Sequence, residues 1–380
     1  MSELRTLAVL TTGRQDYGIL RSTIVLLRDD AEIRARVWAG GMHLRERFGR
    51  PLALLAADGV EPARELDFLG EPPEPAEDAA RALAAVAAAL RADRPDALLL
   101  VGDRSETLAA GMAAALAGVP IVHLHGGEET EGAVDNASRH ALTKLSHLHL
   151  VSHERHAARV RQMGEPPESV IVVGAPGLDN LCRLDLPSRT DVATSLGHPL
   201  PDPLVLVTVH PATLGDDPEA EVRAVAQAMA TWPATYVVTQ PNADGGGAAI
   251  RRFWAEWARG RPNVVLVDAL GETRYWALLR EAAAVVGNSS SGIIEAPAAG
   301  VPAVNVGDRQ RGRLRFGRVI DAPARADAVA EALRAALDGA ADATAEPAGY
   351  PAGPAAPRIV AALRGWRPPR PPRKRFRDLQ

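Results

Sequence analysis

The sequence predicts an α/β protein built as two domains, each a parallel β-sheet with helices on both faces. Short runs rich in valine, isoleucine and leucine alternate with alanine-rich helical stretches along most of the chain. This alternation is typical of parallel sheets covered on both faces. A length of 380 residues is long for one domain and comfortable for two.

The expected strands form two series. The first series comprises LAVLT (7–11), RVWAG (36–40), DALLLVG (96–102), PIVHLHG (120–126), LHLVS (148–152) and VIVVG (170–174). The second comprises LVLVTVH (204–210), TYVVTQ (235–240), NVVLVD (263–268), AVVGN (284–288) and PAVNVG (302–307). Helices are expected between strands, as in AARALAAVAAALRA (79–92) and RSETLAAGMAAALAG (104–118).

The segment 184–203 is rich in proline and turn residues and separates the two series, so we predict an interdomain linker there. The predicted domains are therefore 1–183 and 204–345. Residues 346–380 are expected to form a proline- and alanine-rich loop, a short helix and a basic tail. We expect the tail to be solvated and partly disordered, although a basic tail also suits acidic partners.

Composition excludes several classes of partner. A net charge of -4 argues against a general nucleic-acid or membrane surface. No apolar run approaches the roughly 20 residues of a membrane helix, and the first strand follows Met1 without a secretory leader. The single cysteine, Cys182, excludes an internal disulfide framework and fits a reducing compartment. We predict a cytoplasmic protein without nucleic-acid or membrane partners.

Unusual polar residues directly follow many of the expected strands. In the first series they are Arg14, Asp16, His43, Asp103 and Arg104, and in the second they are His210, Asn242 and Asn288. Ligands of open parallel sheets bind beyond the carboxyl ends of the strands. A loop or capping role suits any one of these residues, but their repetition indicates a central cleft that both domains face.

The densest polar stretch is HLHGGEETEGAVDNASRH (123–140), which holds three histidines, four carboxylates and an arginine directly after the apolar run VPIV. Polar groups at the end of a buried strand point to a site. A zinc site formed by His123, His125 and His140 is one hypothesis. We predict no metal, because the chain lacks a ligand set of familiar spacing.

The segment GNSSSGIIEAPAAG (287–300) predicts an anion site. A strand ends there, small residues turn the chain, and a helix is expected to begin near Ser291, where backbone N–H groups attract phosphate. N-capping by serine is the alternative. The favoured groups are Ser289, Ser290, Ser291 and the arginines 309, 311 and 313. The patterns GxxxxGK[ST] and GxGxxG are absent, which excludes a P-loop and weakens a dinucleotide site.

Nine motifs in order resemble the hydrolysing UDP-N-acetylglucosamine 2-epimerases, especially the branch of sialic and legionaminic acid pathways. The resemblance covers roughly residues 5–340. The motifs are TGRQDYG, GMHL, VGDRSE, HLHGGE, VDNASRHALTKLSH, VTVHPAT, QPNADGG, GNSSSGIIEAP and NVGDRQRGR. The resemblance implies the GT-B fold of two Rossmann-like domains, a UDP-sugar substrate, no cofactor and a homodimer.

The resemblance, together with the polar residues that follow the strands, predicts roles for residues. The expected catalytic set is Asp103, His125, Glu128, Asp135 and His210. The expected substrate-binding set is Arg14, Asp16, His43, Arg104, Arg139, His140, Asn242, Ser289, Ser290, Ser291, Glu295, Arg309 and Arg313. Within that set, Arg14 and Glu295 match nucleotide positions. Ser289, Ser290 and Arg309 match diphosphate positions.

The reaction that the resemblance implies explains these groups. UDP leaves C1 as the C2 proton is removed, and water then adds to the 2-acetamidoglycal to give free N-acetylmannosamine. No neighbouring carbonyl acidifies the C2 proton, so a positioned base is needed. The departing diphosphate needs arginine and backbone N–H groups as its charge grows.

The chain departs from the family pattern HxEGGE at one position, where His125 stands in place of a catalytic glutamate. The spacing to Asp135 is also one residue longer. Three roles for His125 remain open: a replacement base, the mark of an altered reaction, or a structural histidine with Glu128 or Glu129 taking over. The alternative functions are hydrolysis or elimination without epimerisation, a GT-B glycosyltransferase, and a non-catalytic UDP-sugar-binding regulator.

Overall fold

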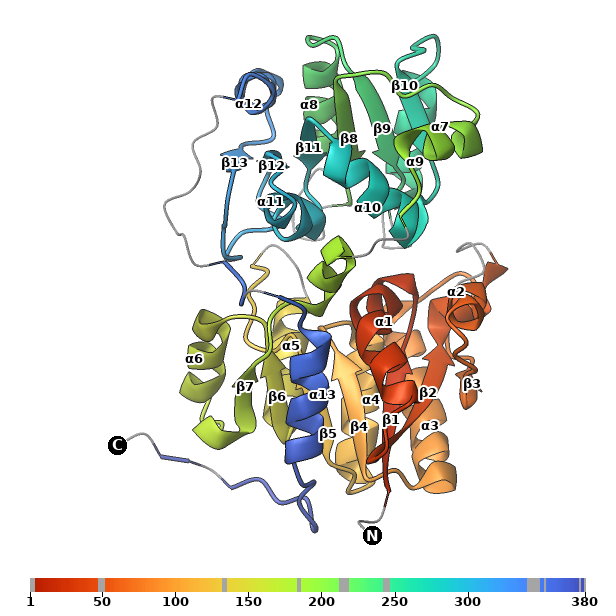
Figure 1. Cartoon of the computed structure of the whole chain (residues 1–380), viewed down its shortest axis with the longest axis vertical. Helices are drawn as coiled ribbons and strands as arrows, with labels where there is room; N and C mark the ends of the chain where they lie inside the picture. Colours follow the sequence, from red (N-terminus) through yellow and green to blue (C-terminus); the bar gives the residue numbers. More distant parts are fainter. Residues whose placement is uncertain are drawn as a thin grey trace. The chain divides into compact units, whose positions relative to one another are not determined.

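The computed structural model describes residues 4–46, 52–131, 135–182, 186–211, 219–241, 247–339, 349–351, 353–375 and 377–378. The chain forms two compact units, drawn in Figure 1. The first unit comprises Met1–Glu128, Asp135–Asp179 and Tyr350–Gln380, and the second comprises Glu129–Val134 and Asn180–Gly349. Each unit is a parallel sheet with helices, which confirms the predicted fold class.

The first unit has a seven-stranded sheet of order β3-β2-β1-β4-β5-β6-β7, and all its strand pairs are parallel. The strands are β1 (Arg5–Thr11), β2 (Ile33–Gly40), β3 (Arg64–Leu66), β4 (Ala97–Val101), β5 (Ile121–Leu124), β6 (Leu148–Val151) and β7 (Val170–Val172). The α-helices are α1 (Arg14–Arg28), α2 (Leu52–Ala57), α3 (Pro75–Asp93), α4 (Ser105–Leu116), α5 (Asp135–Leu145), α6 (Glu154–Gln162) and α13 (Ala356–Gly365). Short 3₁₀ turns are η1 (Gly41–Leu44) and η3 (Pro167–Ser169).

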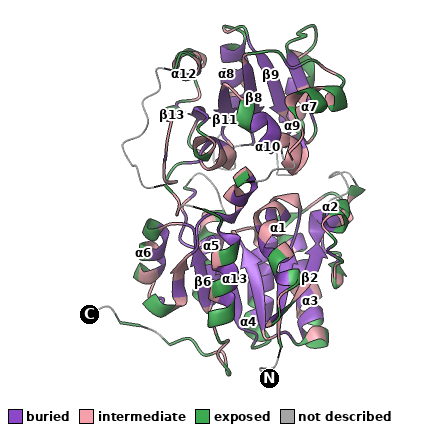
Figure 2. Cartoon of the chain, viewed as in Figure 1, coloured by how far each residue is buried: buried purple, intermediate pink, exposed green. Residues whose placement is uncertain are grey.

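Alternate residues of β1 supply two separate cores, because successive side chains of a strand point to opposite faces. Leu7 and Val9 pack in one core with side chains of α1 and α13. Ala8 and Leu10 pack in the other with side chains of α3 and α4. Figure 2 shows the central strands of this sheet as buried. A sheet buried on both faces explains why its strands read as continuous apolar runs.

The second unit has a six-stranded sheet of order β10-β9-β8-β11-β12-β13, also parallel throughout. Its strands are β8 (Leu204–Thr208), β9 (Thr235–Thr239), β10 (Val264–Val267), β11 (Ala284–Gly287), β12 (Ala303–Val306) and β13 (Val319–Ala322). Its helices are α7 (Arg189–Leu196), α8 (Ala220–Met229), α9 (Gly247–Trp257), α10 (Gly271–Glu281), α11 (Glu295–Ala298) and α12 (Ala326–Leu337), with the 3₁₀ turn η5 (Ser290–Gly292). Side chains of α8 and α12 pack with β8 and β11 in its main core.

Every run predicted as a strand overlaps a strand, whereas β3 and β13 are not predicted from the pattern. Both are short strands at the edge of their sheets. The windows 79–92 and 104–118 overlap α3 and α4, as predicted. No helix in the described ranges has the length and apolar character of a membrane span.

The unit boundaries differ from those expected. The segment predicted as a linker contains α7, which packs with α10 of the second unit. Helix α7 forms because Ser188 accepts from the Asp191 N–H while the Asp191 carboxylate accepts from the Ser188 backbone, a capping box. The chain passes from the first unit to the second within the 3₁₀ turn η4 (Pro176–Cys182).

The short helix expected near the C-terminus is α13, and the described residues of the tail beyond it are exposed or partly exposed. Helix α13 packs beside α1 of the first unit, although the two are far apart in sequence (Figure 1). Its first N–H groups, those of Ala355 and Ala356, donate to the Asp179 carboxylate at 2.6 and 2.8 Å. A carboxylate at this end of a helix satisfies backbone donors that have no helical partner.

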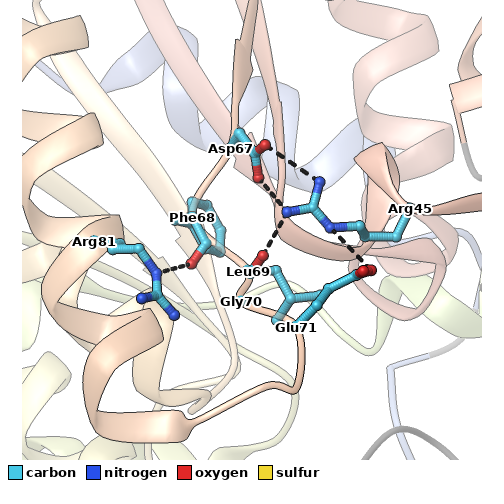
Figure 3. A pocket seen from close by; sticks show the side chains of 7 residues that line it. All are labelled: Arg45, Asp67, Phe68, Leu69, Gly70, Glu71 and Arg81. Carbon is cyan, nitrogen blue, oxygen red and sulfur yellow. Dashed lines mark hydrogen bonds and ion pairs between the residues drawn. The ribbon is translucent and has the colours of Figure 1, made fainter.

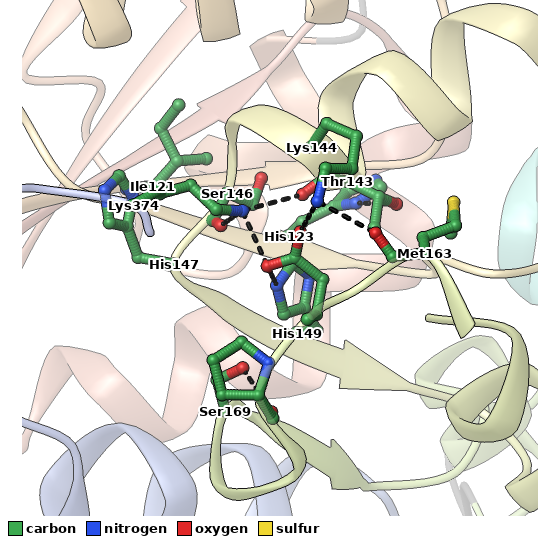
Figure 4. Close-up of polar contacts among 12 residues, drawn as sticks. Ile121, His123, Thr143, Lys144, Ser146, His147, His149, Met163, Ser169 and Lys374 are labelled. Atoms are coloured by element: carbon green, nitrogen blue, oxygen red, sulfur yellow. Dashed lines mark hydrogen bonds and ion pairs between the residues drawn. The ribbon is translucent and has the colours of Figure 1, made fainter. Parts of the chain in front are cut away.

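Beyond α13, Lys374 anchors the basic tail to the first unit. Its Nζ lies 2.6 Å from Glu165 Oε2 and also donates to the Ser146 carbonyl. Lys374 and Ser146 are labelled in Figure 4. The other lysine of the chain, Lys144, reaches the second oxygen of Glu165 at 2.6 Å. A buried carboxylate needs such partners, and these contacts hold the tail against the first unit.

Candidate functional site

The strand order of the first unit reverses between β1 and β4, so the ends of these strands form a topological switch point. Asp16 follows β1 and is buried, and its Oδ2 accepts from the Thr12 N–H at 2.9 Å and from the Thr12 hydroxyl. Burial raises the pKa of Asp16 to about 6, against the opposing charge of Arg104 after β4. A carboxyl group with this pKa changes charge near neutrality.

His43 lies at the neighbouring strand end, in the η1 turn that follows β2. Its ring is buried, and Nε2 lies 2.9 Å from the Thr11 hydroxyl. Arg14 is the first residue of α1. The first unit therefore places the predicted residues Arg14, Asp16, His43 and Arg104 on segments that follow three adjacent strands.

Asp103 follows β4 and forms an ion pair with Arg139 of α5. Arg139 is almost fully buried, and its Nη1 also donates to the His125 carbonyl at 2.8 Å and lies 3.7 Å from Glu128 Oε2. The guanidinium thus links the ends of β4 and β5. The Asp103 carboxylate is thus engaged by the Arg139 guanidinium through its Oδ2.

His125 follows β5 and takes a left-handed backbone conformation, with a φ of 67°. Its N–H donates to the Leu150 carbonyl of β6 at 3.0 Å, which holds the strained residue in place. The ring Nδ1 lies 2.6 Å from Glu128 Oε1. Ring and carboxylate are both buried, so the first unit brings two of the predicted catalytic residues into direct contact.

Two residues that sequence analysis did not select complete this cluster. The Ser152 hydroxyl donates to Glu128 Oε1 at 2.9 Å and also lies 2.9 Å from His156 Nδ1 of α6. Gly127 allows the loop to approach α6, since a Cβ there would lie 2.4 Å from the His156 carbonyl oxygen. Ser152 directly follows β6, so the rule that selects polar residues after strands would have found it.

Helix α5 carries the remaining predicted residues of this region. Asp135 is its first residue and is exposed, while His140 is half-buried in its next turn.

His123 lies in β5 with its ring nitrogens near the Gly102 carbonyl, at 2.9 Å, and the Thr143 hydroxyl, at 3.3 Å. Within the described ranges, no three His, Cys, Asp or Glu side chains converge as metal ligands.

The second unit has its own switch point, between β8 and β11. His210 follows β8, and Asn288 follows β11. The two residues exchange hydrogen bonds, from the His210 N–H to Asn288 Oδ1 at 2.7 Å and from Asn288 Nδ2 to the His210 carbonyl at 2.8 Å. Asn288 also donates to buried Glu221 of α8 at 2.6 Å, and burial raises the pKa of that carboxyl group.

The helix expected near Ser291 is replaced by the 3₁₀ turn η5 and the four-residue helix α11. A continuous helix from Ser291 would need the N–H of residue 297 for its hydrogen bonds, and Pro297 has none. Ser289 caps the turn by accepting from the Ser291 N–H at 3.3 Å, and Ser291 bonds to the Tyr275 hydroxyl. The helix-dipole argument is therefore weak, and Ser289 fulfils the capping alternative.

Cationic side chains nevertheless gather beside this turn. Arg309 Nη1 donates to the Asn288 carbonyl at 3.3 Å, and Gln310 Nε2 donates to the same oxygen at 2.9 Å. Glu295 opens α11, and Arg313 lies in the loop after Arg309. The second unit thus brings Arg309 to the serine turn, an arrangement suited to an anion. Asn242 lies outside the described residues.

The family model for UDP-N-acetylglucosamine 2-epimerase matches residues 26–364. The chain belongs to this family. It is therefore an enzyme of this family. It is also similar to individual proteins of known name. A Legionella pneumophila protein, UDP-N,N'-diacetylbacillosamine 2-epimerase (hydrolyzing), is 33% identical over 332 residues, covering 86% of this chain and 87% of that protein. A Campylobacter jejuni GDP/UDP-N,N'-diacetylbacillosamine 2-epimerase (hydrolyzing) is 31% identical, covering 84% of each.

Solved structures show the same fold. The UDP-GlcNAc 2-epimerase of Neisseria meningitidis bound to UDP-GlcNAc has a TM-score of 0.81 at 18% identity, covering 95% of this chain and 99% of that chain. The UDP-GlcNAc 2-epimerase of Methanocaldococcus jannaschii in complex with UDP-GlcNAc and UDP has a TM-score of 0.80 at 14% identity, covering 94% and 99%. These likenesses agree with the predicted GT-B-like fold.

A pocket in the first unit of this epimerase-family enzyme is lined by residues 45, 67–71 and 81 (Figure 3). Arg45 pairs there with Asp67 at 2.7 Å and with Glu71 at 3.7 Å. Arg81 pairs with Asp78 of its own helix. Since these arginines already hold carboxylates, the pocket is a poorer anion site than the serine turn of the second unit.

Proposed function

We propose that the chain hydrolyses a UDP-linked 2-acetamido sugar, releasing UDP and the free sugar epimerised at C2. Membership of the 2-epimerase family supports this proposal. So do the names of the two diacetylbacillosamine 2-epimerases that it resembles. The observation that carries the chemistry is the His125–Glu128 pair at the end of β5, joined through Arg139 to Asp103.

In this proposal the first unit acts on the sugar. His125, Glu128, Asp103 and Asp135 form the acid–base set, with Arg139 holding the charges of the carboxylates. Of these, His125 is the favoured base for the C2 proton, because Asp103 is paired with the Arg139 guanidinium. The substrate-binding residues of this unit are Arg14, Asp16, His43, Arg104 and His140.

The second unit binds UDP in this proposal. Arg309 and the serine turn, from Ser289 to Ser291, hold the diphosphate, with Arg313 adding positive charge. Glu295 binds the ribose, and Asn242 contributes to the sugar side. His210, which Asn288 fixes after β8, stabilises the departing phosphate as its charge grows.

Calorimetry tests the nucleotide assignment. UDP should bind more tightly than uridine, and Arg309→Ala should weaken UDP about tenfold or more, since a charge-assisted hydrogen bond contributes about 1.5–3 kcal/mol. Arg311→Ala is a matched control, because Arg311, which the sequence placed in the anion site, is largely exposed and pairs with Glu131 at 3.1 Å instead. Equal binding of UDP and uridine would remove the diphosphate site.

Turnover tests the reaction itself. The purified chain is supplied separately with UDP-N-acetylglucosamine and UDP-N,N'-diacetylbacillosamine, without any acceptor. We expect UDP and a 2-epimeric free sugar, identified by ³¹P NMR and by chromatography against standards. A free sugar with unchanged C2 configuration, or a glycal, would establish the second candidate, a hydrolase or eliminase without epimerisation. His125 in place of the family glutamate motivates that candidate.

A further inference from the structure

We propose that Glu128, held by Ser152 and His156, fixes His125 in one tautomer, with a proton on Nδ1 and the lone pair on Nε2. Ser152 and His156 are thereby positioning residues, and Nε2 is the atom that takes the C2 proton. The assignment rests on the proposed function and deepens it.

Four buried side chains form one hydrogen-bonded chain within the first unit. His125 Nδ1 lies 2.6 Å from Glu128 Oε1, which lies 2.9 Å from the Ser152 hydroxyl. That hydroxyl lies 2.9 Å from His156 Nδ1. All four residues are buried, so protein groups and not bulk water decide where the protons lie.

Counting donors and acceptors assigns the protons. A carboxylate only accepts, so the single hydroxyl proton of Ser152 goes to Glu128. The Ser152 oxygen must then accept from His156, which requires a proton on His156 Nδ1. Glu128 also accepts from His125, which requires a proton on His125 Nδ1. A neutral His125 therefore carries its lone pair on Nε2.

The surroundings favour these charge states. Arg139 lies 3.7 Å from the other oxygen of Glu128, which stabilises an ionised carboxylate. Burial lowers the pKa of His156 to about 4, so His156 is neutral at pH 7 and has one ring proton to donate. The alternative, in which Glu128 is protonated, would place an uncharged acid beside a buried guanidinium.

The other nitrogen of His125 is the one left for chemistry. Within the described ranges, Nε2 of His125 is buried and has no hydrogen-bond partner. The backbone is held on both sides, because the N–H of His125 bonds to Leu150 and its carbonyl oxygen accepts from Arg139. A ring fixed through one nitrogen and unbonded at the other is prepared to accept a proton.

The proton transfer to His125 accompanies the departure of UDP. The C2–H bond breaks, its proton goes to His125 Nε2, and its electrons form the C1=C2 double bond. The C1–O bond breaks, and its electrons leave with the β-phosphate oxygen of UDP. Water then adds hydroxyl to C1 and a proton to C2, and His125 returns its proton to solvent. Glu128 stabilises the imidazolium formed in between.

The tautomer is tested on the resting enzyme by ¹⁵N NMR of the histidine-labelled full chain, with His125→Gln identifying the His125 signals. We expect Nδ1 to show the shift of a protonated nitrogen and Nε2 that of a nitrogen with a lone pair. A proton on Nε2 in the wild type would overturn the proposal. This result is independent of turnover, so it stands apart from a failure of the proposed function.

Variants test the positioning role. Ser152→Ala should lower kcat on the order of 10- to 100-fold, because it removes a hydrogen bond to a charged group. Its KM should stay within about twofold of the wild-type value. Its His125 signals should move towards a mixture of tautomers, and Ser152→Thr should restore both. Ser146→Ala is the matched control, because Ser146 is equally buried but bonds to the Leu142 carbonyl. Unchanged kcat and unchanged His125 signals in Ser152→Ala would refute the positioning role.

Discussion

Two buried histidine–glutamate pairs lie on neighbouring strands of the first unit, in very different surroundings. His125 and Glu128 meet just after β5, where the chain has left the sheet. His149 lies within β6 and meets Glu165, with 3.0 Å between Nε2 and Oε2. The pairs share residue types, burial and hydrogen-bond length within a few tenths of an ångström. They differ in their place on the strand and in their charged neighbours.

The neighbours of Glu165 identify the second pair as structural. Lys144 and Lys374 each reach one of its oxygens at 2.6 Å, and the carboxylate is 1% exposed. These bonds, together with His149, lower the pKa of Glu165 to about 2 against the effect of burial, while burial lowers that of His149. Its contacts join β6, α5 and the C-terminal tail, whereas Glu128 orients a single ring. Charged neighbours and place on the strand, and not the pair itself, therefore separate the proposed catalytic pair from the structural one.

The largest expected difference is in turnover. His125→Ala should lower kcat about 10²- to 10⁴-fold, the usual contribution of a general base. His149→Gln should leave kcat nearly unchanged, because glutamine retains an N–H donor for Glu165. Steady-state UDP release measures both. Comparable losses of kcat in the two variants would erase the distinction between the pairs.

Stability should show the opposite order. Glu165→Gln removes a buried charge that two lysines and a histidine face. We expect the free energy of unfolding to fall by about 2–3 kcal/mol. This is less than for a fully buried ion pair, because the lysine side chains are partly exposed. Urea unfolding measures it, with His125→Gln as the comparison. If the two variants unfold at the same urea concentration, Glu165 does not support the fold.

The two lysines should contribute unequally. The Lys374 side chain is 25% exposed and the Lys144 side chain is 50% exposed, so solvent screens the Lys144–Glu165 pair more. We expect Lys374→Met to lower the free energy of unfolding by about 1–2 kcal/mol, and Lys144→Met to lower it by about 0.5 kcal/mol. Limited proteolysis of the C-terminal tail provides a second readout, in which only Lys374→Met should accelerate cleavage. Equal cleavage in the wild type and both variants would mean that Lys374 does not hold the tail.

Acid should weaken the second pair. The folded pKa of Glu165 is depressed from 4.5 to about 2, so its stabilisation is present above pH 4.5 and disappears as the pH falls towards 2. His149 has a pKa depressed from 6.5, so it adds destabilisation below pH 6.5. Unfolding free energies at pH 5 and pH 3 measure the slope across this window, which Glu165→Gln should make smaller. An equal slope in the variant would show that Glu165 titrates normally.

The comparison also explains what sequence could predict. Apolar strand runs and the polar residues that follow them are local features, so the fold class and the place of His125 after a strand were within reach of sequence analysis. Glu165 and Lys374 lie 209 residues apart, and no local pattern joins them. The rarity of lysine was a signal, since both lysines of the chain contact Glu165. Strands β3 (REL) and β13 (VIDA) contain charged residues and lack the apolar run that marked β7 (VIV), which is an equally short edge strand.

The central claim is that the His125–Glu128 pair removes the proton at C2 of the bound sugar. The most direct measurement is deuterium at C2 of the released sugar, followed by ¹H NMR in deuterated water with the wild type, His125→Gln and His149→Gln. The account predicts one deuterium at C2 with the wild type and His149→Gln, and a greatly slowed release of deuterated sugar with His125→Gln. Release of deuterated sugar at the wild-type rate by His125→Gln, or retention of hydrogen at C2 by the wild type, would contradict it.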